Sequence, residues 1–171
     1  MSQLKVNSIV PTSGLPSGAS GGIIQLVSTT KTDTFSSSST NTDITGLSVT
    51  ITPQSSNSKI LILMSITGTN ANSSQRFAFG LKRGSTQIAQ GDAASNRARA
   101  SAGGQDSGGG HCDSMVVVHL DSPSTTSATV YQAISMAIDS GTNIVNRTNS
   151  DADASSYARF ASFITAFEIG G

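Results

Sequence analysis

The sequence predicts an all-β protein, an antiparallel β-sandwich or jelly roll of about eight strands, and three observations support this. The longest apolar run, at residues 58–66, is rich in β-branched side chains and is flanked by Asn57 and Gly68, which favours a strand over a helix. Other apolar segments alternate with polar residues at the two-residue period of a half-buried strand. Turn signals rich in Gly, Pro, Ser and Asn recur at the spacing typical of sandwiches and jelly rolls.

The central run is apolar on both faces of the predicted strand. Alternate side chains of a strand point to opposite faces. One face carries Ile60, Ile62, Met64 and Ile66, and the other carries Leu61 and Leu63. A strand that is apolar on both faces must be covered on both. We expect the first face to line the sandwich core and the second to lie against a neighbouring subunit.

The composition is that of a single domain with a lean core. The 171 residues are 36% hydrophobic and lack tryptophan, so we expect assembly to supply part of the stability. Only 12% are charged and the net charge is zero, whereas nucleic-acid binders usually carry a basic excess. The single cysteine, Cys112, excludes an intrachain disulfide framework. No apolar run approaches the ~20 residues that span a membrane, and no signal-peptide pattern is present, so neither a membrane partner nor secretory export is expected.

The chain divides into an arm at residues 1–22 and a head domain at residues 23–171. Leu4, Val6 and Ile9 form a brief extended apolar pattern, which the prolines and glycines at residues 11–22 then interrupt. Such a segment builds no core alone, so it is either disordered or laid against another protein. Residues 4–9 have the pattern of a strand that pairs with a partner's sheet edge.

The head is expected to contain strands in the following order. They lie at residues 23–27, 47–51, 58–66, 77–81 with a short return at 87–89, 115–120, 130–138, 144–145 and about 157–169. Residues 30–42 are expected to form a surface strand or loop, and 67–75, 91–114 and 148–156 to form polar loops, the second of them Gly-rich and irregular. In the last strand Phe163 and Phe167 share a face, and with Leu61 and Leu63 they are the candidates for the subunit interface.

Residues 105–109 resemble the segment around a serine-protease nucleophile. That chemistry needs a His base and a buried Asp beside the serine, here Ser107. Both histidines, His111 and His119, follow Ser107 within a dozen residues, in the wrong order for that fold, and Gln105 replaces the usual glycine. A flexible Gly-rich loop is therefore the preferred interpretation.

Metal and ligand signals are equally sparse. A zinc site needs three or four Cys or His ligands, and one chain offers only His111 and Cys112 together, although a trimer would bring three copies of His111 to its axis. Asp151 and Asp153 lack the rest of a calcium-loop pattern, so a solvated loop is preferred. We predict no catalytic, cofactor-binding or metal-binding residue.

Two further motifs have plain explanations. Arg97 and Arg99 either contact an anion or acidic neighbour or form a solvated basic loop, and the loop is preferred. Asn72 and Asn146 begin glycosylation patterns, which matter only in a eukaryotic secretory route.

Several segments resemble virion proteins of cyanophages and other marine phages. The opening, residues 1–9, is similar to that of many tail-fibre and virion proteins, and similar segments recur at 23–27, 47–53, 58–62, 81–86 and 120–123. The resemblance implies a jelly-roll head similar to the trimeric tumour necrosis factor-like fold, with an N-terminal arm that anchors it to the particle. The chain has no shaft, which suits a capsid decoration or short head-fibre protein better than a long tail fibre.

The expected function is therefore that of a non-enzymatic structural protein of the virion. The head would be a homotrimer, and the arm would bind the major capsid protein or another virion protein through Leu4, Val6 and Ile9 by strand addition. The alternative is a tail-fibre or adhesin head that binds a host-surface glycan or receptor. In that case the loops at 91–114 and 148–156, with Tyr157, would contact sugar.

Overall fold

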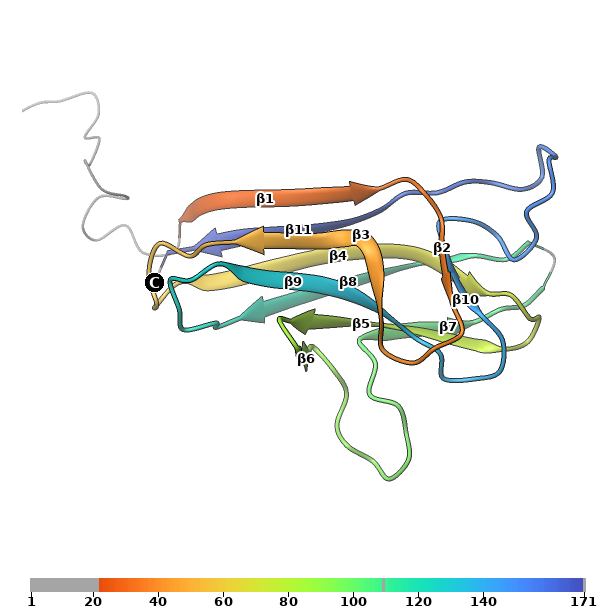
Figure 1. The fold of residues 1–171 in the computed structure, drawn as a ribbon, viewed down its shortest axis with the longest axis horizontal. Helices are drawn as coiled ribbons and strands as arrows, with labels where there is room; N and C mark the ends of the chain where they lie inside the picture. Colours follow the sequence, from red (N-terminus) through yellow and green to blue (C-terminus); the bar gives the residue numbers. More distant parts are fainter. Residues whose placement is uncertain (1–21, 109, 171) are drawn as a thin grey trace, which may run out of the picture.

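The computed structural model describes residues 22–108 and 110–170, which form two antiparallel sheets packed face to face and contain no helix (Figure 1). The expected arm and its candidate anchoring residues, Leu4, Val6 and Ile9, lie outside the described residues. The all-β sandwich predicted from the sequence is confirmed.

The strands follow in this order: β1 Ile23–Lys31, β2 Phe35–Ser37, β3 Thr42–Ile51, β4 Lys59–Asn70, β5 Arg76–Arg83, β6 Thr86–Ile88, β7 Ala102–Gln105, β8 Asp113–Asp121, β9 Thr129–Met136, β10 Asn143–Val145 and β11 Ser162–Ile169.

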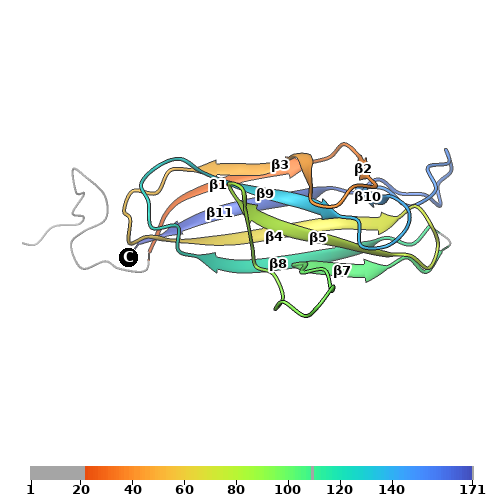
Figure 2. The ribbon, with the colours of Figure 1, turned by 60° about the horizontal axis from the view of Figure 1, so that its bottom comes forward.

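Sheet A has the order β1-β11-β4-β8, and Figure 2 shows these strands one below the other in this order. Beyond the end of β11, the last residues of β4 pair with the short strand β10 instead, and β2 pairs with the other edge of β10. Sheet B has the order β3-β9-β5, with β6 and β7 pairing with the two ends of β5. If β6 and β7 count as one interrupted edge strand, each sheet has four principal strands. Consecutive principal strands alternate between the sheets except at the step from β5 to the β6/β7 edge strand, which stays in sheet B, as in a jelly roll.

The core lies between the sheets, and the two-residue period of each strand decides which side chains enter it. Ile60, Ile62, Met64 and Ile66 of β4 are essentially inaccessible to solvent, as predicted. They meet Phe77, Phe79 and Leu81 of β5 and Tyr131 of β9 from the opposite sheet.

Strand β4 runs four residues beyond its predicted end, to Asn70, so the prediction of a polar loop at 67–75 is wrong for residues 67–70. The extension depends on Gly68. A Cβ there would lie 2.6 Å from the Phe79 ring and 2.7 Å from the Ile144 carbonyl oxygen, so only glycine lets the strand pass between them.

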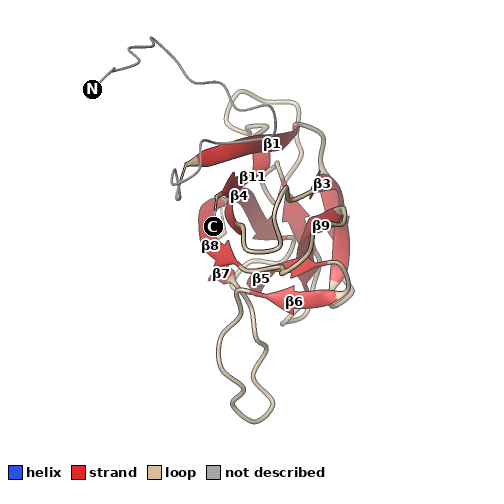
Figure 3. Cartoon of the chain, turned by 90° about the vertical axis from the view of Figure 1, so that its left-hand side faces the viewer, coloured by secondary structure: helices blue, strands red, loops and turns tan. Residues whose placement is uncertain are grey.

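The irregular stretch expected at 91–114 is also partly wrong, because residues 102–105 form β7. This strand pairs with β5, and Gly104 lies opposite Phe77, where a Cβ on the glycine would lie 2.8 Å from the Phe77 ring. The glycines that predicted a loop are thus required by a close strand pair. Residues 89–101 project from the body, as expected for a surface loop (Figure 3).

The last strand begins at Ser162 rather than near Tyr157. The preceding residues bond to the neighbouring loop instead. The Phe160 amide donates to the Asn146 carbonyl over 3.0 Å, and Arg159 forms an isolated bridge with Arg147.

The sandwich has two distinct ends. At the proximal end the described chain both begins and finishes, and the Gly170 amide donates to the Gly22 carbonyl over 2.9 Å. The opposite, distal end carries the loops at 71–75, 106–112, 137–142 and 146–161, and Figure 1 shows this last stretch far from the C-terminus.

Candidate functional site

The outer face of sheet A is an apolar surface built from three neighbouring strands. Its members, called here the A-face, are Leu61 and Leu63 of β4, Phe163 and Phe167 of β11, and Val116, Val118 and Leu120 of β8. The ladder registers set them in rows across the sheet. One row is Phe167–Leu61–Leu120, and the next is Thr165–Leu63–Val118. All four residues predicted as interface candidates therefore lie on one continuous surface.

Exposure within the A-face rises toward the edge strand. Val116, Val118 and Leu120 of β8 are 62%, 63% and 51% exposed, whereas the four interface candidates are half-buried by their neighbours in the sheet. On the opposite edge, Leu26 of β1 pairs with Phe167 and is 53% exposed. The sheet thus presents large apolar side chains to solvent along both margins.

The A-face is nearly free of charge. Its gaps are filled by hydroxyl side chains, among them Ser28, Ser65 and Thr165, and the Ser28 and Thr165 hydroxyls share a hydrogen bond of 2.8 Å. Of the outward positions on β1, β11, β4 and β8, only Lys59 at the proximal margin is charged, and its Nζ donates to the Ser122 hydroxyl over 3.0 Å. Such a surface has no charge pattern with which to select a charged ligand.

The outer face of sheet A is large enough to be an interaction surface. From Lys59 to Thr67, β4 extends roughly 26 Å at about 3.3 Å per residue, and the four strands of sheet A add about 14 Å in width. The footprint is then about 360 Å², within the range of the largest apolar patch on a monomeric soluble protein, and such a patch is often functional.

A polar cluster joins the two sheets near the proximal end. Tyr131 of β9 is fully buried and donates its hydroxyl to Asp121 of β8 over 2.6 Å. Arg83 of β5 donates to both carboxylate oxygens of Asp121, each over 2.8 Å. Burial and the adjacent carboxylate raise the pKa of Tyr131 well above its usual value, so the phenol stays protonated and keeps donating. Sequence reasoning missed this cluster, because its members come from three strands in two different sheets.

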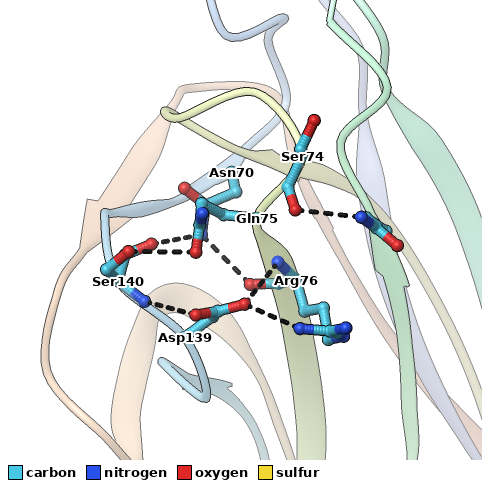
Figure 4. A network of polar contacts seen from close by, with 7 residues as sticks. Asn70, Ser74, Gln75, Arg76, Asp139 and Ser140 are labelled. Atoms are coloured by element: carbon cyan, nitrogen blue, oxygen red, sulfur yellow. Dashed lines mark hydrogen bonds and ion pairs between the residues drawn. The ribbon is translucent and has the colours of Figure 1, made fainter.

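The distal end carries a second polar network, shown in Figure 4. The Asn70 amide donates to the Arg76 carbonyl over 3.1 Å, and the Arg76 guanidinium donates to Asp139 over 3.1 Å. The backbone amides of Ser140 and Arg76 together with the Arg76 guanidinium hold the pKa of Asp139 below its usual range. This network fastens the 71–75 loop to the 137–142 loop.

The protease-like segment is structural in its contacts. Asp106 is fully buried and accepts hydrogen bonds from the Thr69 hydroxyl, over 2.6 Å, and from the Gly108 amide. Ser107 is exposed, and no hydrogen bond joins it to either histidine in the part of the chain that the structure describes. Gly109 lies outside that part. The buried acid therefore anchors the loop to β4 rather than orienting a base.

His111 and Cys112 are likewise occupied locally. His111 Nε2 lies 3.0 Å from Asp113, and the Cys112 thiol donates to the Arg147 carbonyl over 3.5 Å. Burial, followed by the nearby carboxylates of Asp113 and Asp106, raises the pKa of Cys112 to about 11. Within residues 22–108 and 110–170, no three His, Cys, Asp or Glu side chains are grouped to hold a metal.

The remaining motifs also find partners inside the chain. Asp151 lies 2.6 Å from the guanidinium of Arg159 and 4.0 Å from that of Arg147, so an ion pair engages it. Arg97 and Arg99 donate to carbonyls of their own loop, those of Ala94 and Gly91.

Asn146, in one of the two glycosylation patterns, is fully buried and cannot accept a glycan. Its amide nitrogen donates to the Lys31 and Asp33 carbonyls, and its oxygen accepts from Ser162 over 2.6 Å. Asn72 of the other pattern is exposed. The asparagine side chain at 146 is therefore a structural link between β1, β10 and β11.

None of the described residues belongs to a helix long and apolar enough to cross a membrane. Comparison with known proteins gives no further assignment, because no protein-family model and no curated protein matches the sequence.

Proposed function

We propose that the chain is a non-enzymatic structural protein of a phage particle whose jelly-roll head assembles as a homotrimer through the A-face. The observation that carries this proposal is the nearly uncharged apolar surface across β11, β4 and β8. Burying such a surface is favourable by roughly 25 cal/mol per Å² of apolar area removed from water.

A second copy of the same chain is the partner that suits this surface. An uncharged apolar face pairs well with another of its kind, since desolvating it costs little and leaves no charge unpaired. Homo-oligomers also close most often through self-complementary or ring-forming contacts. The resemblance to marine phage proteins described above is the reason for choosing a trimer as the oligomeric state and the virion as the location.

The placement of the ends supports attachment through the arm. The described chain begins at Gly22 on the proximal end, beside Gly170, so an arm attached there would leave the distal loops facing outward. Residues 1–22 would bind the major capsid protein or another virion protein by strand addition, with Leu4, Val6 and Ile9 as apolar contacts.

Two variants test assembly and anchoring separately. Deleting residues 1–22 is expected to abolish incorporation into purified particles while leaving the head trimeric. The substitution Val118→Asp is expected to dissociate the trimer. Unchanged incorporation of the deletion variant, measured by quantitative mass spectrometry of particles, would refute the anchoring role of the arm.

A further inference from the structure

The distal end contains a polar hollow that assembly through the A-face does not use. It has a volume of about 360 Å³, within the range of small-ligand sites. Its polar lining comes from Asp151, Asp153, Tyr157 and Arg159, and its apolar lining from Ala152, Ala154 and Ala158. All seven belong to the 146–161 stretch, which Figure 1 shows at the end opposite the C-terminus.

Two groups in the hollow have hydrogen-bonding capacity to spare. Neither the Asp153 carboxylate nor the Tyr157 hydroxyl has a hydrogen bond or ion pair within the described residues, whereas Asp151 is paired with Arg159 over 2.6 Å. Arginine has five N–H donors, so Arg159 retains others beyond this pair. The hollow thus offers both acceptors and donors.

Tyr157 is half-buried and its backbone is fixed by a local turn, in which the Tyr157 amide donates to the Ala154 carbonyl over 3.0 Å. The neighbouring loop passes near the ring, since a Cβ on Gly110 would lie 3.5 Å from the ring carbon Cε1, an ordinary van der Waals distance. A half-buried ring loses less entropy than a fully exposed one when a ligand stacks on it.

The hollow is lined by charges of both signs. Two carboxylates, those of Asp151 and Asp153, lie beside one guanidinium, that of Arg159, and Asp151 is already paired with Arg159. A cationic ligand would meet the Arg159 guanidinium, and an anionic ligand would meet the unpaired Asp153. The chemistry favours an uncharged ligand with many hydroxyl groups and an apolar ring face.

We infer that this hollow binds a neutral oligosaccharide. Sugar hydroxyls would donate to Asp153 and accept from Arg159 and the Tyr157 hydroxyl, and the C–H face of a hexose would lie on the Tyr157 ring. The inference does not depend on assembly, although a trimer would display three such sites on one end and raise the avidity for a glycan-coated surface.

The test uses an array of neutral glucose-, galactose- and mannose-based oligosaccharides with acidic oligosaccharides beside them, followed by titration of the bound sugars by NMR. Full-length protein is compared with Asp153→Asn and Tyr157→Ala. Asp43→Asn is the matched control, because Asp43 is an exposed carboxylate on β3, outside both loops that were considered for contact with sugar.

The full-length chain is expected to bind at least one neutral oligosaccharide. Asp153→Asn and Tyr157→Ala are expected to weaken that binding about tenfold or more, and Asp43→Asn to leave it unchanged. If Tyr157→Ala lowers the midpoint of thermal unfolding, the test rests on Asp153→Asn alone, because the exposed Asp153 side chain makes no hydrogen bond or ion pair within the described residues that would stabilise the fold. Binding to acidic sugars only, no binding to neutral ones, or equal affinity in the two hollow variants would overturn the inference. Repeating the titration on Val118→Asp separates this outcome from a failure of assembly.

Discussion

Replacing Val118 by Asp is the sharpest perturbation of the A-face. Val118 lies on the outward side of β8 opposite Leu63, and 63% of its surface is in solvent. Because the side chain is exposed in the single subunit, the substitution costs the isolated fold about 1 kcal/mol at most, the span of strand propensities. In an assembly that covers the A-face, the same carboxylate would be buried without a partner.

The magnitude follows from the exposed fraction. Full burial of a valine side chain contributes roughly 1.5–3 kcal/mol, so covering the exposed part of Val118 contributes about 1–2 kcal/mol per subunit. A buried, unpaired carboxylate adds a penalty of several kcal/mol. With three copies in a trimer the total loss is on the order of 10 kcal/mol, and each 1.4 kcal/mol is tenfold in the association constant.

Sedimentation velocity at micromolar concentration is the assay, with Val130→Asp as the matched control. Val130 is a valine on a strand of sheet B, 41% exposed, and lies away from the A-face. Val118→Asp is expected to sediment as a folded monomer and Val130→Asp as the wild-type assembly. An unchanged assembly in Val118→Asp would refute the assignment of the A-face as the interface.

Three further predictions concern the interior. Tyr131→Phe is expected to lower the free energy of unfolding by about 1–2 kcal/mol. Asp121→Ala is expected to lower it by about 3–5 kcal/mol, because it leaves the Arg83 guanidinium and the buried Tyr131 hydroxyl without their partner. Equal losses for the two variants in chemical denaturation would contradict this ranking. Burial acts to raise the pKa of Glu168, but hydrogen bonds from the Gln25 side chain and the Gln54 amide outweigh it and hold it below the usual 4.5. The stability that this carboxylate contributes is therefore present above about pH 4.5 and lost as pH falls through the lowered pKa. Glu168→Gln should then be about 1.5–3 kcal/mol less stable than wild type at pH 7, and this difference should narrow as pH falls below about 4.5. A difference that does not depend on pH would contradict the assignment. With a pKa of about 11, Cys112 should react with iodoacetamide at pH 8 roughly 100-fold more slowly than an ordinary cysteine, and a rate like that of free cysteine would show an accessible thiolate.

Period-two alternation explains which part of the fold could be predicted from the sequence. In β4 the side chains at 60, 62, 64 and 66 reached the core as expected, because a strand covered on one face leaves no alternative register. The grouping of Phe163 and Phe167 on one face held for the same reason. Neighbouring strands then placed Leu61 and Leu63 beside them through the antiparallel ladder.

Features that depend on packing between distant strands could not be predicted. The glycines of β7 looked like a loop, because their role is to let one strand approach another and nothing local shows that contact. Val116, Val117 and Val118 are β-branched without alternation, so only pairing with β4 decides that Val117 enters the core and its neighbours face outward. The Asp121–Tyr131 bond needs two strands from different sheets to meet.

The central claim is that copies of this chain cover the A-face of one another. Sedimentation equilibrium of the wild-type chain at micromolar concentration tests it most directly, since the measured mass does not depend on shape. The account predicts a mass three times the 17.4 kDa of the chain. A stable mass of 17.4 kDa, with the valines of β8 left in solvent, would contradict it.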